Sequence, residues 1–471
     1  MIRYKINLPD ALHARARFGL RLLFEAQGIV SAPAAGDEDP DLVYGGREGE
    51  EPAQALHVPH FDGNWDDPER SLPTDPSDVN DADPVSLTWF FAAGIAESVQ
   101  NRSDFGLPIA RGSRLWREGA LQRPYVAELS GSLLRLVRRH AEARNRSVPV
   151  IPRWPDGRTF AIVVTHDVDR PFSRPPASHY RARIARDWRR GTYRDATRGA
   201  LAFVKNVVIA GDSGRDPHND PQFGFDRWMR VEEDLGIRSA FYFAVRGSAD
   251  AVGNVHDVYY DARHPAIVGA MRDAIARGFE VGLHASIASR DDPSLLADER
   301  KQLSTLLDGL DVRGVRHHYL ALSPSLPERT LGEHASVGFR YDSSLGFSDA
   351  AAFRRGVAWP FRPFDKEHGS EINVLQIPLT AMDIGLFHHA RLESEPIAAL
   401  EAHVDTVEKA GGCAVLNWHV ANAAPERLHG AGPALIEVLR RRIERHGNSV
   451  WLTTPGRLEA WWTERRSRVF P

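Results

Sequence analysis

The stretch that most constrains the fold is residues 160–171, which reads FAIVVTHDVDRP. Its first five residues are apolar and rich in β-branched side chains, a composition typical of a strand buried on both faces. The run ends at His166, Asp167 and Asp169. Two carboxylates and an imidazole are costly to bury there unless a cation neutralises them. The stretch therefore predicts a buried parallel strand that ends either in a cation site or in a turn capped by two aspartates.

The chain after residue 160 alternates short apolar strands with amphipathic helices. In one such helix, leucines recur at positions 303, 306, 307 and 310, the spacing of a single helix face. Seven or eight units of this rhythm predict the α/β class, as a distorted (β/α) barrel rather than an open sheet. Residues 171–223 are too many for a simple loop, so we expect a helical insertion that covers the end of the first strand.

The first part of the chain has a different pattern. Residues 1–148 combine apolar helices with a stretch rich in Asp, Glu, Pro and Gly, and a proline-rich linker follows at 144–158. We predict a smaller N-terminal α/β domain over 1–148 and the barrel over 149–471. No constellation of reactive groups occurs in the first domain, so we expect it to have a structural or substrate-gripping accessory role.

Composition limits the partners and the compartment. The formal charge of -4 shows no basic excess, so no nucleic-acid partner is expected. The single cysteine, Cys413, excludes an internal disulfide framework and fits a reducing compartment. Neither a signal peptide nor an apolar stretch of about 18 residues is present, so we expect a cytoplasmic protein without a transmembrane segment. The oligomeric state is not indicated.

Polar residues follow five of the predicted strands. They lie at 165–169, 282–286, 315–319, 340–344 and 416–419. A single His at a strand end is more often structural, but the carboxyl ends of all barrel strands meet at one mouth. One carboxylate with two imidazoles is a ligand set for Zn²⁺ or another borderline divalent ion, with a position left open for water. A second carboxylate could act as general base, a distant His as general acid, and an Arg could keep the base ionised.

Over about residues 158–465 these segments resemble the polysaccharide deacetylases of the NodB-homology type. Members of that family are metal-dependent enzymes on a distorted (β/α) barrel that remove acetyl groups from N-acetylated sugars. The THDVD segment at 165–169 is similar to the family's first motif, and GLH at 282–284 to its second. The resemblance implies that Asp167 is the general base, and that Asp169 and His284 are metal ligands.

Later motifs extend the resemblance. RHHY at 316–319 lies where the family has an Arg, two prolines and a Tyr, and LNWH at 416–419 is similar to the last motif. The resemblance implies that Arg316 steadies Asp167, that the Tyr319 backbone N–H holds the oxyanion, and that His419 is the acid. The 341–346 segment resembles that of a subgroup of the family that also carries an N-terminal domain. From this resemblance we expect Asp342, Arg362 and Asp383 to contact the substrate. For Arg362 and Asp383 a salt-bridged loop is the alternative.

One position departs from the family pattern. The second motif has another His four residues after the first, where this chain has Ala288, which cannot bind a metal. We expect His318 to supply the third ligand, with His317 as the alternative because neighbouring side chains point to opposite sides. His166 and His256 are further candidates.

The resulting hypothesis is a hydrolase that removes the N-acetyl group of an amino sugar in a surface-polysaccharide or related glycan pathway, with Zn²⁺ as the preferred ion. One alternative is a non-catalytic glycan-binding or scaffold protein on a degenerate barrel, which Ala288 favours. Another is a hydrolase of a different amide or an ester. A serine hydrolase is disfavoured by the lack of a G-x-S-x-G elbow, and no P-loop or dinucleotide-binding glycine pattern occurs.

Overall fold

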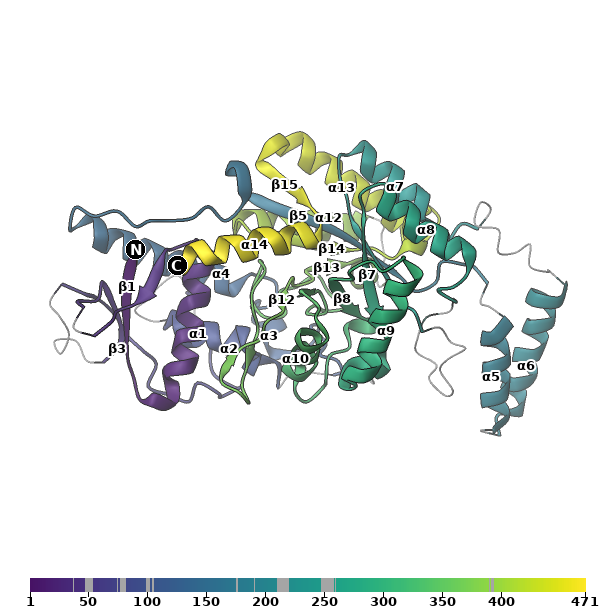
Figure 1. The fold of residues 1–471 in the computed structure, drawn as a ribbon, viewed down its shortest axis with the longest axis horizontal. Helices are drawn as coiled ribbons and strands as arrows, with labels where there is room; N and C mark the ends of the chain where they lie inside the picture. Colours follow the sequence, from purple (N-terminus) through teal and green to yellow (C-terminus); the bar gives the residue numbers. More distant parts are fainter. Residues whose placement is uncertain are drawn as a thin grey trace.

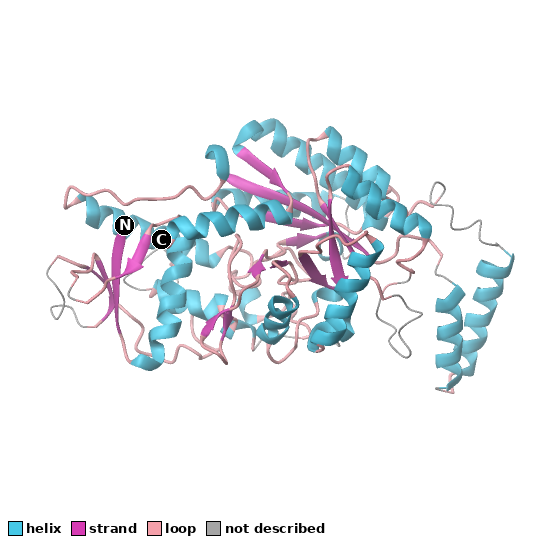
Figure 2. Ribbon diagram, in the orientation of Figure 1, coloured by secondary structure: helices cyan, strands magenta, loops and turns pink. Residues whose placement is uncertain are grey.

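The computed structural model describes residues 1–36, 38–46, 54–73, 75–76, 82–98, 102–103, 106–174, 177–189, 191–209, 220–246, 258, 260–388, 390 and 394–471. It contains a small N-terminal sheet, a large parallel sheet with helices around it, and a helix pair that projects from one end (Figures 1 and 2). The predicted mixed α/β fold with a smaller N-terminal α/β part is confirmed.

The N-terminal sheet has four parallel strands in the order β2-β1-β3-β4. These strands are β1 (Ile2–Asn7), β2 (Ser31–Pro33), β3 (Leu42–Gly45) and β4 (Leu56–Val58). The helices of this part are α1 (Asp10–Gln27), α2 (Pro84–Ala92), α3 (Arg114–Arg117) and α4 (Tyr125–Glu142). Helices α1, α2 and α4 pack against one another.

The large sheet curls into a partial barrel of parallel strands in the order β12-β9-β8-β7-β6-β5-β14-β13, with β15 also pairing with β5. Its strands are β5 (Phe160–Val168), β6 (Ala240–Phe243), β7 (Glu280–Ala285), β8 (Gly314–His317), β9 (Tyr341–Asp342), β12 (Leu375–Gln376), β13 (Ala381–Met382), β14 (Cys413–Asn417) and β15 (Val450–Thr453). Strand β5 lies at its centre and is buried along its whole length, as its apolar sequence predicts.

The two edges of the sheet are joined by residues 377–380, which run from β12 to β13. Along this segment Ile377 donates its backbone N–H to Asp342, Leu379 donates to Leu345, and Thr380 donates to Val415 of β14. The edge strands β12 and β13 are thus joined by the chain itself and not by a ladder of hydrogen bonds between them. This is the distortion expected of a distorted (β/α) barrel.

Helices cover the outside of the curled sheet (Figure 2). They are α7 (Phe225–Asp234), α8 (Pro265–Ala276), α9 (Pro293–Leu306), α10 (Pro327–Val337), α11 (Asp383–Phe387), α12 (Ser394–Lys409), α13 (Ala431–His446) and α14 (Pro455–Val469). Several begin with Pro at the first position after a capping side chain; the pairs are Asp83-Pro84, His264-Pro265, Asp292-Pro293 and Thr454-Pro455. Pro fits this position because its missing N–H would have no helical partner.

Buried contacts fix the N-terminal part to the barrel. Glu25 of α1 accepts hydrogen bonds from Trp462 and Arg466 of α14, which runs beside the N-terminal part in Figure 1. Glu97 pairs with Arg354 and Arg355 at 2.9 and 2.7 Å. A short antiparallel pair, β10 (Phe364–Asp365) with β11 (Ser370–Glu371), places Phe364 against Phe18 and Trp89. A domain boundary at residue 148 stays a prediction.

The insertion after β5 contains two helices, α5 (Ala177–Arg189) and α6 (Tyr193–Phe203), followed by a π-helical turn, Val204–Ile209. Helices α5 and α6 pack closely on each other. The expectation that they cover the end of β5 was wrong, since Figure 1 shows the pair standing away from the sheet. No helix in the described part of the chain is both long enough and apolar enough to cross a bilayer.

Candidate metal centre

Three potential metal ligands meet at the carboxyl ends of β5, β7 and β8. Asp169 follows the last residue of β5, His284 lies in β7, and His318 begins the short 3₁₀ turn after β8. One ligand atom from each lies within 4.8 Å of those of the other two. His284 Nε2 is 3.1 Å from Asp169 Oδ1, and His318 Nε2 is 3.6 Å from Asp169 Oδ2. The structure thus brings together the three residues that the sequence proposed as metal ligands.

The protonation pattern of this group fits a bound cation. His284 Nδ1 donates to the Arg316 carbonyl at 2.9 Å, which fixes the ring with Nε2 directed toward Asp169. Among the described residues, His284 Nε2 and Asp169 Oδ1 are buried without a hydrogen bond, although they face each other. Burial raises the pKa of Asp169, but the neighbouring His318, His284 and His419 outweigh it and hold this pKa well below its usual value. An ionised carboxylate beside two imidazoles is a donor set that suits a borderline divalent ion.

Asp167 lies beside the three ligands on the same face of β5 as Asp169, two residues away. Its Oδ1 accepts from Arg316 Nη1 at 2.8 Å, and its Oδ2 accepts from Asn417 Nδ2 at 2.8 Å. Oδ2 is 4.0 Å from His284 Nε2, so it is the oxygen nearer the cluster. Burial raises the pKa of Asp167, but Arg316 together with His284 and His419 outweighs it and the net pKa is lowered, which keeps the carboxylate ionised.

The guanidinium of Arg316 is fully buried and held from several sides. Besides Asp167, it donates to Thr165 Oγ1 and Asn417 Oδ1, at 2.9 and 2.8 Å. Its Nε and Nη2 donate to Ser343, and the face of the group lies 4.5 Å from the Tyr242 ring centroid. Arg316 is therefore fixed in one orientation, with its charge directed at Asp167.

His419 lies on the other side of the cluster and is oriented by Asp383. Its Nδ1 is 2.8 Å from Asp383 Oδ1, and its backbone N–H donates to Asp383 Oδ2 at 2.8 Å. Nε2 faces Asp169 Oδ2 at 3.3 Å. Burial lowers the pKa of His419, but Asp383 and Asp169 outweigh it and raise this pKa well above the usual value. The site thus has an ionised carboxylate on one side and a protonated imidazole on the other.

The turn at His318 and Tyr319 has an unusual backbone. Tyr319 and Leu320 both have φ of 58°, a left-handed conformation that is uncommon for large side chains. Such conformations concentrate at functional sites, where surrounding contacts fix them. The turn keeps the His318 side chain buried next to His284, with ring centroids 5.2 Å apart, and leaves Tyr319 exposed. The oxyanion role of the Tyr319 N–H stays a prediction.

The other candidate imidazoles point elsewhere. His317 Nδ1 donates to the Ser286 carbonyl at 3.1 Å, its Nε2 is 2.9 Å from His334 Nε2, and burial lowers its pKa to about 3. His166 uses both nitrogens, toward the Trp418 carbonyl at 2.8 Å and Glu232 Oε1 at 2.7 Å. His256 lies outside the described residues. His318, rather than His317 or His166, therefore lies with Asp169 and His284.

None of the three residues expected to contact the substrate has an accessible side chain beside the cluster. Asp342 is fully buried, accepts from Ser344 N at 2.8 Å and Ser344 Oγ at 2.7 Å, and so cannot touch a substrate in this structure. Arg362 is half-buried at the junction with the N-terminal part, where burial and then the Arg466 charge lower its pKa. Asp383 is fully buried, and its position shows that it orients His419.

Two residues close to the reactive groups were not proposed from the sequence alone. Asn417 bonds to both Asp167 and Arg316, and Thr165 bonds to Arg316. Asn417 lies two residues before His419 and is paired in register with Thr165. The alternation of strand side chains could have placed it on the same face as His419.

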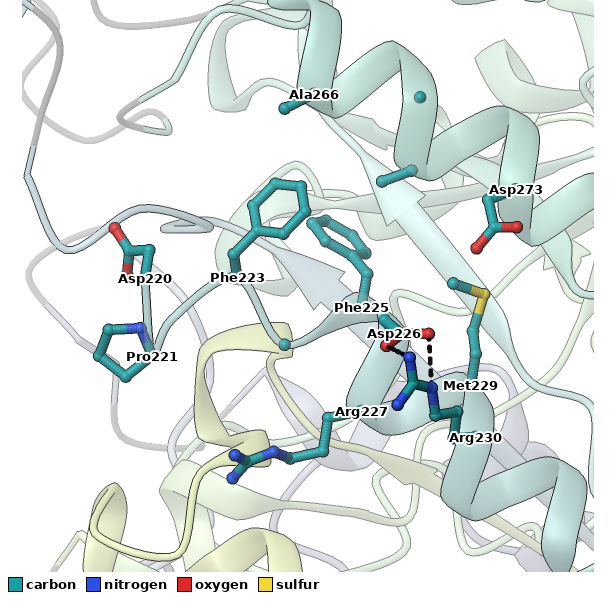
Figure 3. Close-up of a pocket in the computed structure, with 13 residues that line it drawn as sticks. Asp220, Pro221, Phe223, Phe225, Asp226, Arg227, Met229, Arg230, Ala266 and Asp273 are labelled. Atoms are coloured by element: carbon teal, nitrogen blue, oxygen red, sulfur yellow. Dashed lines mark hydrogen bonds and ion pairs between the residues drawn. The ribbon is translucent and has the colours of Figure 1, made fainter. Parts of the chain in front are cut away.

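A groove in the described structure lies away from this cluster. It has a volume of about 790 Å³ and lies between α7 and α8, with Phe223, Phe225 and Met229 beside Asp226 and Arg230 (Figure 3). None of the cluster residues lines it. We place the candidate site at the cluster because the groove has no comparable set of ligands or paired acid and base.

Several solved structures are similar to this chain at low identity. A Mycobacterium smegmatis protein assigned as a polysaccharide deacetylase is 16% identical with a TM-score of 0.43, over 66% of this chain and 93% of its own. A Parabacteroides distasonis protein assigned as a glycoside hydrolase/deacetylase is 11% identical at 0.39, over 66% and 73%. The 4-alpha-glucanotransferase of Thermococcus litoralis is 13% identical at 0.37, over 64% and 40%. No protein-family model and no curated protein matches the chain.

Proposed function

We propose that this chain is a metal-dependent deacetylase that hydrolyses the N-acetyl group of an amino sugar in a surface-polysaccharide or related glycan pathway. The observation that carries the proposal is the meeting of Asp169, His284 and His318 between two further groups, the Arg316-held Asp167 and the Asp383-held His419. A ligand set with a separate base and acid beside it suits metal-assisted hydrolysis of an amide. The family motifs in the sequence favour an acetylated sugar as the substrate.

Asp169, His284 and His318 would hold the ion, with Zn²⁺ as the preferred choice for one carboxylate and two imidazoles. When bound, the ion supplies Lewis acidity, which polarises an acyl oxygen and makes water more acidic. Their positions at the ends of different strands, with both histidines buried and Asp169 partly buried, hold the three side chains in place before any substrate arrives.

The other residues would move the protons. Asp167, kept ionised by Arg316, would take a proton from the attacking water at Oδ2, the oxygen nearer the cluster. His419, protonated because of Asp383 and Asp169, would give a proton from Nε2 to the leaving amine. The backbone N–H of Tyr319 would donate to the developing oxyanion. Asp383 would act by orienting His419, and Arg316 would act by keeping Asp167 ionised.

Acetate release from N-acetylated amino-sugar oligomers, measured with and without a chelator, tests the proposal. We expect release by the metal-loaded protein and its loss on chelation. Asp167→Ala should abolish turnover and keep the metal, whereas Asp169→Ala should lose the metal. No acetate from any such substrate, with the metal present at one equivalent, would contradict the deacetylase function and favour a glycan-binding protein. Release from simple esters alone would favour the other hydrolase alternative.

The feature that favoured a non-catalytic protein was Ala288, which lies in the 3₁₀ turn Ile287–Asp291. His318 lies in the cluster as the third potential ligand, so a ligand at position 288 is not needed. We therefore prefer the enzyme. A cytoplasmic location remains part of the proposal, because the buried Cys413 fits a reducing compartment.

A further inference from the structure

The helix pair α5–α6 and the π-helical turn after it carry most of the large apolar side chains that the described structure leaves exposed. They are Trp188, Tyr193, Leu201, Val204 and Val208, with exposed fractions between 44% for Val204 and 67% for Leu201. Trp188 and Tyr193 flank the turn between the helices, with ring centroids 5.1 Å apart. Leu201, Val204 and Val208 continue along α6 into the π-helical turn. Exposed apolar side chains gathered on one projecting element mark an interaction surface.

The aliphatic members of this group, Leu201, Val204 and Val208, are not part of the packing between the two helices. A different set lies between α5 and α6: Tyr180 packs on Phe203 with centroids 6.3 Å apart, and Ala196 is buried. Gly199 fits closely against Ile184, where an added Cβ would come within 3.1 Å. The pair therefore has an inner packed face and a separate outer apolar face.

The same segment is strongly basic. Residues 177–209 contain seven Arg and one Lys against two Asp, a formal charge of +6 in a chain whose total is -4. Both acidic groups are already paired, Asp187 with Arg186 at 2.8 Å and Asp195 with Arg198 at 3.4 Å. The exposed cations are Arg181, Arg183, Arg189, Arg194, Arg198 and Lys205. Exposed apolar side chains and exposed cationic side chains thus occur together on one projecting element.

We propose that the α5–α6 pair binds the surface of an anionic lipid bilayer. Trp188 and Tyr193 at the turn, with the aliphatic side chains of α6, would enter the headgroup region, as interfacial amphipathic helices do. The Arg and Lys side chains would contact lipid phosphates while their stems lie along the apolar boundary.

Two other occupants fit the surface less well. A second copy of the pair would bring two segments of +6 charge together, which is unfavourable without a counterion. A nucleic acid would match the cations, but its phosphate backbone offers nothing to Leu201, Val204 and Val208. An anionic bilayer satisfies both kinds of side chain.

Co-sedimentation of the full chain with vesicles tests the proposal. We expect binding to vesicles of phosphatidylglycerol and phosphatidylcholine mixed at about one to two, weakening as salt is raised, and no binding to pure phosphatidylcholine. The double variant Arg194→Gln/Arg198→Gln should weaken binding by about thirtyfold. The variant Leu201→Ser/Val204→Ser should weaken it at all salt concentrations. Acetate release from a soluble oligomer should be unchanged in both.

A matched control comes from exposed arginines on α7 and α8. Arg230→Gln/Arg272→Gln removes two cations with side chains 73% and 56% exposed, outside the helix pair, and should leave vesicle binding unchanged. Thermal melts check that each variant folds. The proposal is overturned if the protein does not sediment with anionic vesicles at low salt, or if it binds pure phosphatidylcholine vesicles equally well. It is also overturned if the control variant loses vesicle binding to the same extent, or if the protein binds a duplex DNA oligonucleotide and not vesicles.

Discussion

Replacing Asp383 with Asn should separate the orientation of His419 from metal binding. Asp383 accepts four hydrogen bonds: from His419 Nδ1 and N at 2.8 Å, and from Asn422 Nδ2 and Ile384 N at 2.7 Å. Asn has nearly the same size and keeps one acceptor oxygen. Its amide group, in the place of Oδ2, would face the His419 backbone N–H and Asn422 Nδ2, which are both donors.

The size of the effect follows from these contacts. A buried donor left without an acceptor costs about 1–3 kcal/mol, and the negative charge opposite the imidazole is also lost. If the transition state loses about 2–3 kcal/mol of stabilisation through these two effects, kcat falls by about 30- to 150-fold. Metal content should stay at the wild-type value because, among the described residues, the Asp383 side chain bonds to His419, Asn422 and Ile384 and to none of the three ligand side chains.

Steady-state kinetics of acetate release, together with metal analysis, measure both effects. Asp365→Asn is a matched control, because Asp365 also accepts from a His Nδ1, that of His368 at 2.7 Å, and from two backbone N–H groups. This second pair lies on the surface, so its loss should leave kcat unchanged. The reasoning is refuted if Asp383→Asn keeps kcat within about threefold of wild type, well inside the effect worked out from the lost contacts, or if it loses the metal.

Three further predictions concern the supports of the site and the fold. Arg316→Lys should lower kcat on the order of a hundredfold at constant metal content, because Lys cannot contact Asp167 and Ser343 together; unchanged kinetics would contradict this. Glu97→Gln should lower the free energy of unfolding in urea by about 3–5 kcal/mol, because Arg354 and Arg355 are left buried without their carboxylate partner. The control Glu118→Gln removes an exposed ion pair and should lower it by under about 1 kcal/mol. Burial raises the pKa of Glu299 from 4.5 to about 7, so the folded state binds its proton more tightly than the unfolded state. The stability that Glu299 contributes should be full below pH 4.5 and be lost as the pH rises through about 7, and the difference in urea midpoint between wild type and Glu299→Gln should follow this loss.

The sequence predicted the parts of the fold that depend on local pattern. The apolar run that became β5 and the alternation of strands and helices were sufficient for the barrel, because side-chain periodicity is set by the backbone. Asp167 and Asp169 are two residues apart in an extended segment, so they had to share a face. The helices of the insertion were also predictable, but their direction was not, since it depends on tertiary contacts.

The choice between His317 and His318 shows where pattern reasoning ends. Strand β8 ends at His317, and His318 begins a turn with left-handed residues, so strand alternation no longer applies there. The pairing of Asp383 with His419 joins α11 to the end of β14, and no local signal connects positions 36 residues apart. Asp342 was misassigned for a related reason: its partners His334 and Gln376 come from other elements and bury it.

The most direct test of the metal centre is a crystal structure of the zinc-loaded protein with anomalous data at the metal edge. The account predicts one strong peak, at bonding distance from a carboxylate oxygen of Asp169, from His284 Nε2 and from an imidazole nitrogen of His318. His317 should remain turned toward Ser286 and His334. A fully loaded protein whose peak lies elsewhere, or whose ion is bound without His318, would contradict the account.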